Sequence, residues 1–328
     1  MSELPAVQRE APARAPTRRA SERRCVTSWL ALLALAACGT ASAQGTGDAM
    51  RGQSVFEAAG GCSCHTDHPG EGEDAPRLAG GRALETPFGT YYSTNITPDP
   101  ETGIGRMSEA EFLRAMQSGV APDGSNYFPV FPYTSFTRMT DADLRDLFAY
   151  LARVTPVERA NRAPDVAAPF GWRFAITAWK WLNFEPGRFV PDPAQSDAWN
   201  RGAYLANGPA HCGECHTPRT LSGGVDRALW LAGSGDGPEG ELAPNITPDD
   251  ETGIGTWSIN DIDWYLETGF KPDGDDTQGL MAELIEHGFS RIAKSDRRAI
   301  AEYLRSLTPI HNVVKASSGE THVHDAPH

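Results

Sequence analysis

Two stretches of the chain carry apolar residues at the spacing of an amphipathic helix. In each stretch, four apolar residues stand at positions i, i+3, i+4 and i+7, which places them on one helical face. The two sets are Leu144, Leu147, Phe148 and Leu151, and Ile300, Tyr303, Leu304 and Leu307. No stretch shows the sustained alternation of apolar and polar residues that is typical of strands. The pattern therefore predicts an all-α fold.

Capping signals place further helices. Two segments start with a serine, carry an acid three residues later and end at a glycine, which is the signature of a capped helix. These triplets are Ser108, Glu111 and Gly119, and Ser258, Asp261 and Gly269. We also expect helices over residues 48–59 and 197–207. Each of these lies shortly before a Cys-His pair.

The chain contains two copies of one unit. Residues 95–105, Asn-Ile-Thr-Pro-Asp-Pro-Glu-Thr-Gly-Ile-Gly, recur with one change as residues 245–255, which is 150 positions later. Arg51-Gly52 recurs as Arg201-Gly202 at the same offset, and Cys64-His65 recurs as Cys215-His216 at an offset of 151. Such self-similarity indicates a duplicated domain. We expect one unit over residues 48–156 and a second over 195–310, each made of short helices and long ordered loops.

An aromatic linker, residues 157–193, separates the two units. Its central part, residues 171–184, contains three tryptophans. It is interpreted either as a helix that docks a partner or as a clamp between the units, and the usual burial of aromatic side chains favours the clamp. The last segment, residues 311–328, carries His322, His324 and His328 on a polar background. This composition predicts a disordered tail, with adventitious metal binding as the alternative.

The N-terminus predicts export. Six arginines precede an apolar run over residues 26–37, and small residues follow it. These are the parts of a secretory signal, here residues 1–43. A second processing site would make the signal residues 1–37 and leave Cys38 as an acylated first residue. We therefore expect a periplasmic protein, either unattached or lipid-anchored to the membrane through Cys38.

Composition and charge narrow the classes of function. The chain has 328 residues, of which 40% are hydrophobic, enough for packed cores. Its 43 acidic residues exceed its 29 Lys and Arg residues, for a formal net charge of -14. Such a surface repels phosphate backbones, which argues against nucleic acid as a partner. No run of 18 apolar residues is present, so a spanning helix is not expected.

The second cysteine pair carries the clearest chemical signal. Cys212-Gly-Glu-Cys215-His216 is the pattern of covalent haem attachment. Both thiols reach the haem vinyl groups from one helical turn, and the adjoining imidazole binds the iron. A redox disulfide and a zinc knuckle are the alternatives. The zinc alternative lacks a second close pair of ligands in the same copy.

The first copy departs from this spacing. It reads Gly61-Cys62-Ser63-Cys64-His65, so its cysteines stand at i and i+2. On a regular helix, residues two apart point about 200° away from each other. We therefore expect Cys64 and His65 to hold the first haem. Cys62 would either bond through a distorted turn or remain a free thiol.

Several segments resemble a known family. They are residues 78–90, the two Asn-Ile-Thr-Pro-Asp loops, residues 131–134 and residues 211–218. The chain resembles, over most of residues 48–310, the dihaem cytochrome c family related to the cytochrome subunits of membrane-bound alcohol dehydrogenases. The resemblance implies two tandem cytochrome c folds with one covalent haem c each. It also implies a periplasmic dehydrogenase as electron donor, and an oxidase, another cytochrome or a quinone-linked acceptor.

A sixth iron ligand is expected at each haem, because electron-transfer haems usually carry two axial ligands. Met281 is the candidate for the second haem, since we expect it in a loop between helices and the resemblance places a distal methionine in this segment. The repeat offset carries Met281 onto Phe131, which cannot bind iron. We choose Met139, the nearest downstream sulfur, with a core position before Thr140 as the alternative. His68 is another base within reach.

The repeated Asn-Ile-Thr-Pro-Asp loops are interpreted as haem-edge loops. In this interpretation the hydroxyls of Thr97 and Thr247 hold the pocket rim, and Trp257, Tyr91 or Tyr92 donates to haem propionates. Ordinary turn chemistry is the alternative.

Two functions are compatible with these residues. An electron carrier relays single electrons from a dehydrogenase. A dihaem enzyme of peroxidase type instead keeps one iron open, which Phe131 and the irregular first cysteine pair would favour. No additional acid-base constellation supports catalysis, so the carrier is favoured.

Overall fold

A computed structural model describes residues 47–67, 76–168, 171–237 and 240–316. Several expectations fall outside these residues: the signal peptide with Cys38, the ligand candidate His68, and the three tail histidines. Asn312, at the start of the predicted tail, donates from its backbone to Thr252 Oγ1 (3.0 Å) and from its side chain to the Ala232 carbonyl (2.8 Å). This part of the segment is therefore held against the second repeat.

The elements of the first repeat follow the predicted helices. They are α1 (Ala49–Ala58), a 3-10 turn (Gly60–His65), β1 (Ala83–Thr86), β2 (Gly89–Tyr92), α2 (Glu109–Ser118), α3 (Tyr133–Phe136) and α4 (Asp141–Leu151). The linker contributes β3 (Asp165–Val166) and α5 (Ala175–Asn183). The amphipathic pattern around Leu144 is thus confirmed as a helix, and α1 lies within the predicted residues 48–59.

The second repeat contains the matching helices. They are α6 (Asp197–Asn207), 3-10 turns at Cys212–Glu214 and Arg227–Leu229, α7 (Ile259–Thr268), α8 (Gly279–Leu284), a π-helical turn (Ile285–Phe289) and α9 (Lys294–Ser306). Both predicted capping boxes form, at Ser108 with Glu111 and at Ser258 with Asp261. Each of these helices ends at a glycine of positive φ, as its sequence predicts.

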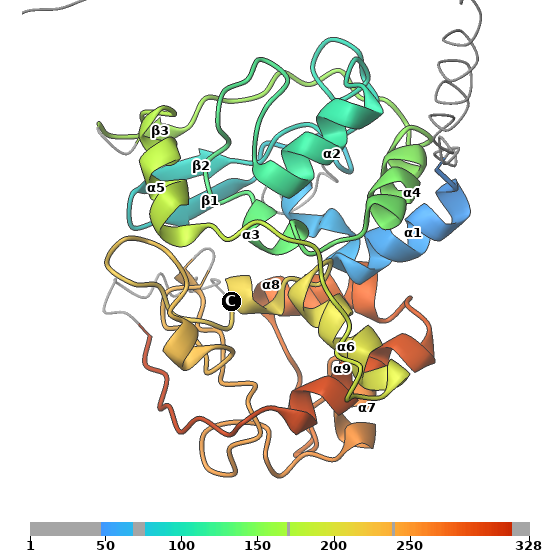
Figure 1. Cartoon of the computed structure of the whole chain (residues 1–328), viewed down its shortest axis with the longest axis vertical. Coiled ribbons are helices and arrows are strands. Elements are labelled where there is room, and N and C mark those ends of the chain that lie inside the picture. The colour runs from blue at the N-terminus through green and yellow to red at the C-terminus, as the bar shows by residue number, and fades with distance from the viewer. Residues whose placement is uncertain (1–46, 68–75, 169–170, 238–239, 317–328) are drawn as a thin grey trace, which may run out of the picture. The chain divides into compact units, whose positions relative to one another are not determined.

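The expectation of an all-α fold is wrong in one respect, because a small antiparallel sheet is present. β1 pairs with β2, with Ala83 opposite Tyr92, and β2 pairs with β3 of the linker (Figure 1). The strands have four, four and two residues. A period of two cannot be recognised over so few positions, and this explains why the sequence pattern did not predict them.

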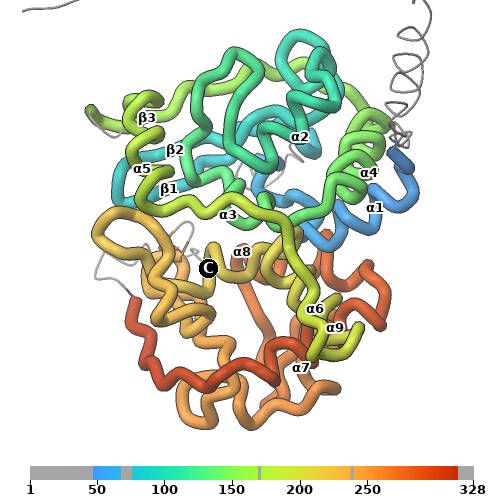
Figure 2. The backbone as a smooth tube through the Cα atoms, in the orientation of Figure 1, coloured from blue at the N-terminus to red at the C-terminus, as the bar shows by residue number. Residues whose placement is uncertain are grey.

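Helix crossings organise the two cores. α1 packs on α4, and α6 packs on α9 (Figure 2). A glycine stands at each crossing: a Cβ at Gly52 would lie 1.9 Å from the Asp146 carbonyl oxygen, and one at Gly202 would lie 1.9 Å from that of Ala299. The repeated Arg-Gly pair therefore marks the place where two helix backbones touch.

The linker makes some of the contacts expected of a clamp. Ile176 of α5 is buried with Tyr91 and Phe128 beside the sheet. Trp179 Nε1 donates to the Ser222 carbonyl of the second repeat over 2.8 Å. Trp181, in contrast, is 83% exposed, so only part of the aromatic run is explained by burial.

Within the described residues, no helix is both long enough and apolar enough to cross a membrane.

Gly202→Ala should destabilise the protein although alanine is the better helix former. The gain in helix propensity is about 1 kcal/mol. It is outweighed by the clash of the new Cβ with the backbone carbonyl group of Ala299, which is fixed within α9. We therefore expect the free energy of unfolding to fall by about 2 kcal/mol. Urea unfolding measures this loss, with Met50→Ala on an exposed position of α1 as control. A midpoint that stays unchanged or rises would contradict close backbone contact at this crossing.

Candidate functional site

The second Cys-His motif lies on a helical turn, as its spacing predicts. After α6 the chain passes through His211 at φ +40° and enters the turn Cys212–Glu214. The backbone N–H of His216 donates to the Cys212 carbonyl over 3.0 Å, which closes the turn. Cys212 and Cys215 carry free thiols. Burial raises the pKa of each to about 12, so both stay protonated until they react.

Both imidazoles are oriented by a hydrogen bond from the ring. His216 Nδ1 lies 2.7 Å from the Pro244 carbonyl, and His65 Nδ1 lies 2.7 Å from the Thr94 carbonyl. Burial lowers the pKa of each imidazole, with the carbonyl acting in the opposite sense. In the neutral ring, a proton on Nδ1 leaves the Nε2 lone pair available for a metal. The two histidines thus have the arrangement that an iron ligand requires.

The Asn-Ile-Thr-Pro-Asp loops supply those carbonyls, since Thr94 and Pro244 immediately precede Asn95 and Asn245. In the second loop the Asn245 side chain donates to the Ile310 carbonyl (2.7 Å), and the Ile310 N–H donates to Thr247 Oγ1 (3.1 Å). Thr247 is buried. The first loop repeats these bonds to Val157.

The threonine hydroxyls that we interpreted as holding a pocket rim thus hold the loops themselves. Both hydroxyl groups accept hydrogen bonds from the segments that follow the last helix of each repeat, α4 and α9, and so connect the loops to these segments.

The first cysteine pair does not sit on a regular helix, so its backbone matches the expected alternative of a distorted turn. Gly61 has φ +66° and Cys62 has φ +51° and ψ +38°. At the repeat offset, Gly61 matches His211, which also has positive φ, and Cys62 matches Cys212. Cys62 also has positive φ, whereas Cys212 does not. This difference stands where the first repeat has one residue fewer between its two cysteines.

Cys62 keeps the environment of its counterpart. It packs against the first core as Cys212 packs against the second. Burial raises the pKa of the Cys62 thiol to about 12, and a nearby Cys64 adds to the shift. The two sulfur-bearing residues thus lie close together in spite of their spacing.

Apolar side chains in matching positions line each site. They pack against the core of their own repeat while remaining partly exposed, as expected of walls that face a large apolar group. The matched pairs are Cys62 and Cys212, Ile96 and Ile246, Met107 and Trp257, and Phe131 and Met281. The residues of both repeats therefore fit a flat, apolar cofactor such as haem.

The methionine candidates differ in their surroundings. Met281 is partly exposed beside the second core, but it lies in α8 and not in the loop that we expected. Gln278, which precedes α8, is extended, so the helix starts only two residues before the methionine. Met139 has none of its surface exposed and packs in the first core, immediately before the N-cap Thr140. Its packing matches the alternative of a core position.

Each attachment turn packs against the other repeat. Glu214 accepts hydrogen bonds from Thr134 Oγ1 (2.5 Å) and Ser135 Oγ (2.7 Å) of the first repeat. Burial alone would raise the pKa of Glu214, but Arg219 and these two hydroxyls lower it, so the carboxylate is ionised. In the other direction, the first turn packs against α8 and the π-helical turn.

The contact at the first turn is close. A Cβ at Gly61 would lie 2.4 Å from the His287 carbonyl oxygen, and one at Gly60 would lie 2.3 Å from Leu284 Cδ2. Cys64 is near enough to Cys215 for its charge to raise the pKa of that thiol. The two Cys-His turns are therefore neighbours.

Across the described residues, no three His, Cys, Asp or Glu side chains gather into a cluster that could hold a metal ion.

Comparison with known proteins defines the class. No family model matches the chain. It is 42% identical over 266 residues to a protein of Cereibacter sphaeroides named diheme cytochrome c-type, which covers 81% of this chain and 88% of the relative. The match places the chain among the c-type cytochromes. It belongs to the dihaem c-type cytochrome family, and two c-type haems are its cofactors.

Longer relatives share the same region. The fructose dehydrogenase cytochrome subunit of Gluconobacter japonicus is 40% identical over 273 residues, which are 83% of this chain and 54% of the relative. A nicotinate dehydrogenase subunit of Pseudomonas putida is 42% identical over 283 residues, 83% of this chain and 23% of the relative. The chain thus spans about half of the first and less than a quarter of the second.

Thr247→Val should loosen the loop that orients His216. The substitution keeps the shape of the side chain but leaves the Ile310 N–H without its acceptor, at a cost of about 1–3 kcal/mol. Thr97→Val should have the same effect in the first repeat, while the exposed Thr308→Val should leave stability unchanged. Denaturant unfolding of the three variants measures the difference. Equal stability of all three would show that the buried hydroxyls do not hold the loops.

Proposed function

We propose that this dihaem cytochrome carries single electrons in the periplasm, from a dehydrogenase through its two haems to a respiratory acceptor. The observation that carries the proposal is the pair of neighbouring Cys-His turns, each with an imidazole fixed at Nδ1 by a backbone carbonyl. When bound, each haem iron alternates between the ferric and ferrous states and so holds one electron.

Each repeat forms one haem domain in this proposal, the first over residues 48–156 and the second over 195–310. Cys212 and Cys215 attach the second haem and His216 binds its iron. Cys62 and Cys64 attach the first haem and His65 binds its iron. The left-handed backbone at Cys62 supports thioether bonds from both cysteines at the first site. It turns the chain in a way that a regular helix does not, and this offsets the shorter spacing between Cys62 and Cys64.

The chain's own residues do three things for the cofactors. The loop carbonyls hold the imidazole rings with Nε2 directed away from the loop. The apolar walls exclude water, which favours the less charged ferrous state and so raises the potential. The packing of each attachment turn against the other repeat, through Glu214 and through Gly61, brings the two turns together, so that electrons pass between the haems within one chain.

The partner is inferred from the relatives. The names of several describe cytochrome subunits of dehydrogenases, among them alcohol dehydrogenase (quinone) of Gluconobacter oxydans and gluconate 2-dehydrogenase of Pantoea cypripedii. A dehydrogenase is therefore the electron donor, and an oxidase, another cytochrome or a quinone-linked protein is the acceptor. These relatives give no support to the peroxidase alternative.

The location rests on the N-terminal sequence. The arginine-rich start and the apolar run of residues 26–37 support export to the periplasm. Cleavage before Cys38 would add a lipid anchor and hold the protein at the membrane surface.

Haem reduction by dehydrogenase substrates tests the function. In periplasmic and membrane fractions of the source bacterium, ethanol, fructose, gluconate or nicotinate should reduce the haems within seconds, as measured by the ferrous absorption bands. A strain that lacks the chain is the control. Haems that stay oxidised with all four, together with turnover of hydrogen peroxide by the purified protein, would favour the peroxidase function.

Methionine substitutions test the axial ligands. Met281→Ala should remove the sulfur-to-iron charge-transfer band of the second haem and lower its potential, because a thioether favours ferrous iron. Met139→Leu should do the same for the first haem, while Met116→Leu, buried in the same core, should change neither. Optical spectra and redox titration of the three variants measure these effects. A band that persists in Met139→Leu would leave Met139 as a core residue only.

A further inference from the structure

One face of α5 exposes large apolar side chains. Phe174, Trp181 and Leu182 stand at i, i+7 and i+8, which places them on one side of the helix. They are 72%, 83% and 79% exposed. Trp172 stacks on Phe174 with ring centroids 5.4 Å apart. These four residues, here called the aromatic face, are of the type that interfaces bury and isolated surfaces avoid.

The opposite side of α5 is fixed. Lys180 Nζ donates to the Ser118 and Gly119 carbonyls at the end of α2, over 2.7 and 2.9 Å. Ile176 is buried near the sheet, and Trp179 bonds to the second repeat. The aromatic face is therefore presented by a helix that is anchored in both repeats, which reduces the entropy lost on binding.

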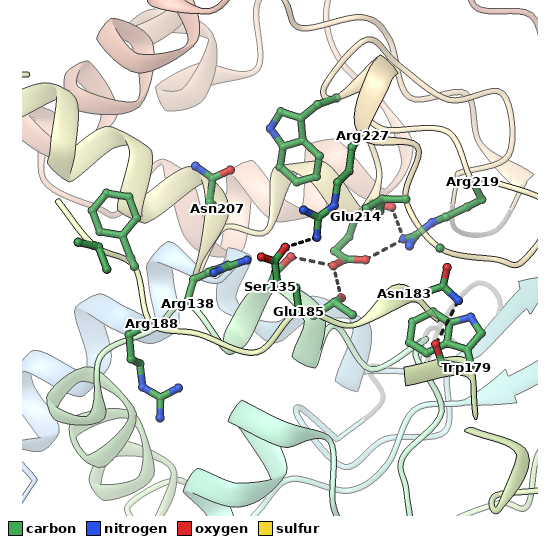
Figure 3. A pocket seen from close by; sticks show the side chains of 16 residues that line it. Ser135, Arg138, Trp179, Asn183, Glu185, Arg188, Asn207, Glu214, Arg219 and Arg227 are labelled. Carbon is green, nitrogen blue, oxygen red and sulfur yellow. Dashed lines mark hydrogen bonds and ion pairs between the residues drawn. The ribbon is translucent and has the colours of Figure 1, made fainter. Parts of the chain in front are cut away.

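A cavity of about 610 Å³ adjoins this helix (Figure 3). Trp179 and Asn183 of α5 line it, together with the segment that follows α5. Its charged lining residues are Arg138, Arg188, Arg219, Arg227, Glu185 and Glu214. Three of these arginines pair with carboxylates: Arg188 with Asp141, Arg219 with Glu214, and Arg227 with Glu185. Arg138 instead donates to the Gly187 carbonyl, so the cavity holds one more guanidinium group than paired carboxylates and can bind a carboxylate of a partner.

The cavity also reaches the second haem site. Glu214, on its wall, lies inside the Cys212–Cys215 attachment turn, and Trp230, also on the wall, contacts that turn at Gly213. A partner seated here is separated from the second attachment site by a single turn of backbone. Electron entry at this place leads to the second haem first and from there to the first.

We propose that the dehydrogenase that donates electrons docks around the C-terminal end of α5, with contacts at the aromatic face and at the arginine-lined cavity next to Asn183. The aromatic face binds an apolar patch of that dehydrogenase, and the cavity receives its carboxylates. At each encounter the dehydrogenase loses one electron and the ferric second haem gains it, with no bond made or broken. This inference rests on the proposed function and adds the place of contact and the haem that receives the electron.

Charge and the relatives favour this occupant over others. An anionic lipid surface and a second copy of this chain both repel a protein of formal charge -14. In the nicotinate dehydrogenase relative from Pseudomonas putida, the region similar to this chain is 23% of a longer dehydrogenase polypeptide. A region similar to this chain thus occurs within a longer polypeptide that is named as a dehydrogenase subunit.

Matched variants test the docking surface. Trp181→Ser with Leu182→Ser removes apolar contact area, and Trp264→Ser is the control because Trp264 is also exposed, at 55%, on α7. Arg227→Glu reverses a charge at the cavity, where Arg227 pairs with Glu185. Arg106→Glu is its control because Arg106 has a similar exposed partner, Glu101. The measurement is the rate of haem reduction in fractions of the source bacterium, with the substrate that reduces the wild-type chain.

We expect the Trp181 and Leu182 double variant to slow haem reduction roughly tenfold or more, as loss of an interface anchor does. Arg227→Glu should slow it at low salt and weaken its salt dependence. Both controls should keep the wild-type rate, and all variants should keep the wild-type spectrum and potentials. Wild-type rates in both surface variants would overturn the docking proposal while leaving the carrier function intact. Failure of every substrate to reduce the wild-type chain would instead overturn the function.

Photo-crosslinking identifies the occupant. Benzoylphenylalanine at position 181 should attach the chain in cells to a dehydrogenase polypeptide, recognised by mass spectrometry and by haem reduction in the isolated product when substrate is added. The same group at position 264 should not. Attachment to lipid, to a second copy of the chain or to nothing at position 181 would overturn the proposal, as would equal attachment at both positions.

Discussion

The hydrogen bond between each imidazole and a loop carbonyl is the constraint on which the sites depend. His65 and His216 make this bond at the same length, 2.7 Å, to residues that immediately precede the repeated loops. Those loops are held from within by buried Asn and Thr side chains, which bind the chain where each repeat ends. The repeated motif therefore positions the two carbonyl groups that orient the histidine rings. The helices that cross at Gly52 and Gly202 form the cores against which the motif packs.

The two repeats are not independent of each other, because each packs against the attachment turn of the other. In the second attachment turn, the buried carboxylate of Glu214 accepts hydrogen bonds from two hydroxyl groups of the first repeat. In the first turn, the backbone of Gly60 and Gly61 packs against the segment that follows Met281. Each attachment turn is therefore part of the other repeat's surroundings, and both turns lie where the two repeats meet. The proposed relay of electrons needs this closeness, and the proposed docking of a donor uses the exposed outer face of the linker helix α5.

Much of the fold could be predicted because its signals are local. The capping boxes at Ser108 and Ser258, the i, i+3, i+4, i+7 helices and the Cys212–His216 motif each depend on residues within a few positions. The errors concern features set by tertiary context. The left-handed backbone at Cys62, the helix around Met281 and the short strands β1 to β3 carry no periodic pattern. Aromatic composition predicted burial of the linker, whereas Trp181 is 83% exposed.

The way in which haem is attached to the intact protein tests the two matched sites most directly. The pyridine haemochrome spectrum, measured against the protein mass, gives the number of haems per chain and the number of saturated vinyl groups. We predict two haems per chain and a reduced band at the position of doubly linked haem, because Cys62 and Cys64 lie together in spite of their spacing. One haem per chain would contradict the presence of two matched sites. Two haems with a band shifted to the red would show an unsaturated vinyl and contradict the double attachment at Cys62.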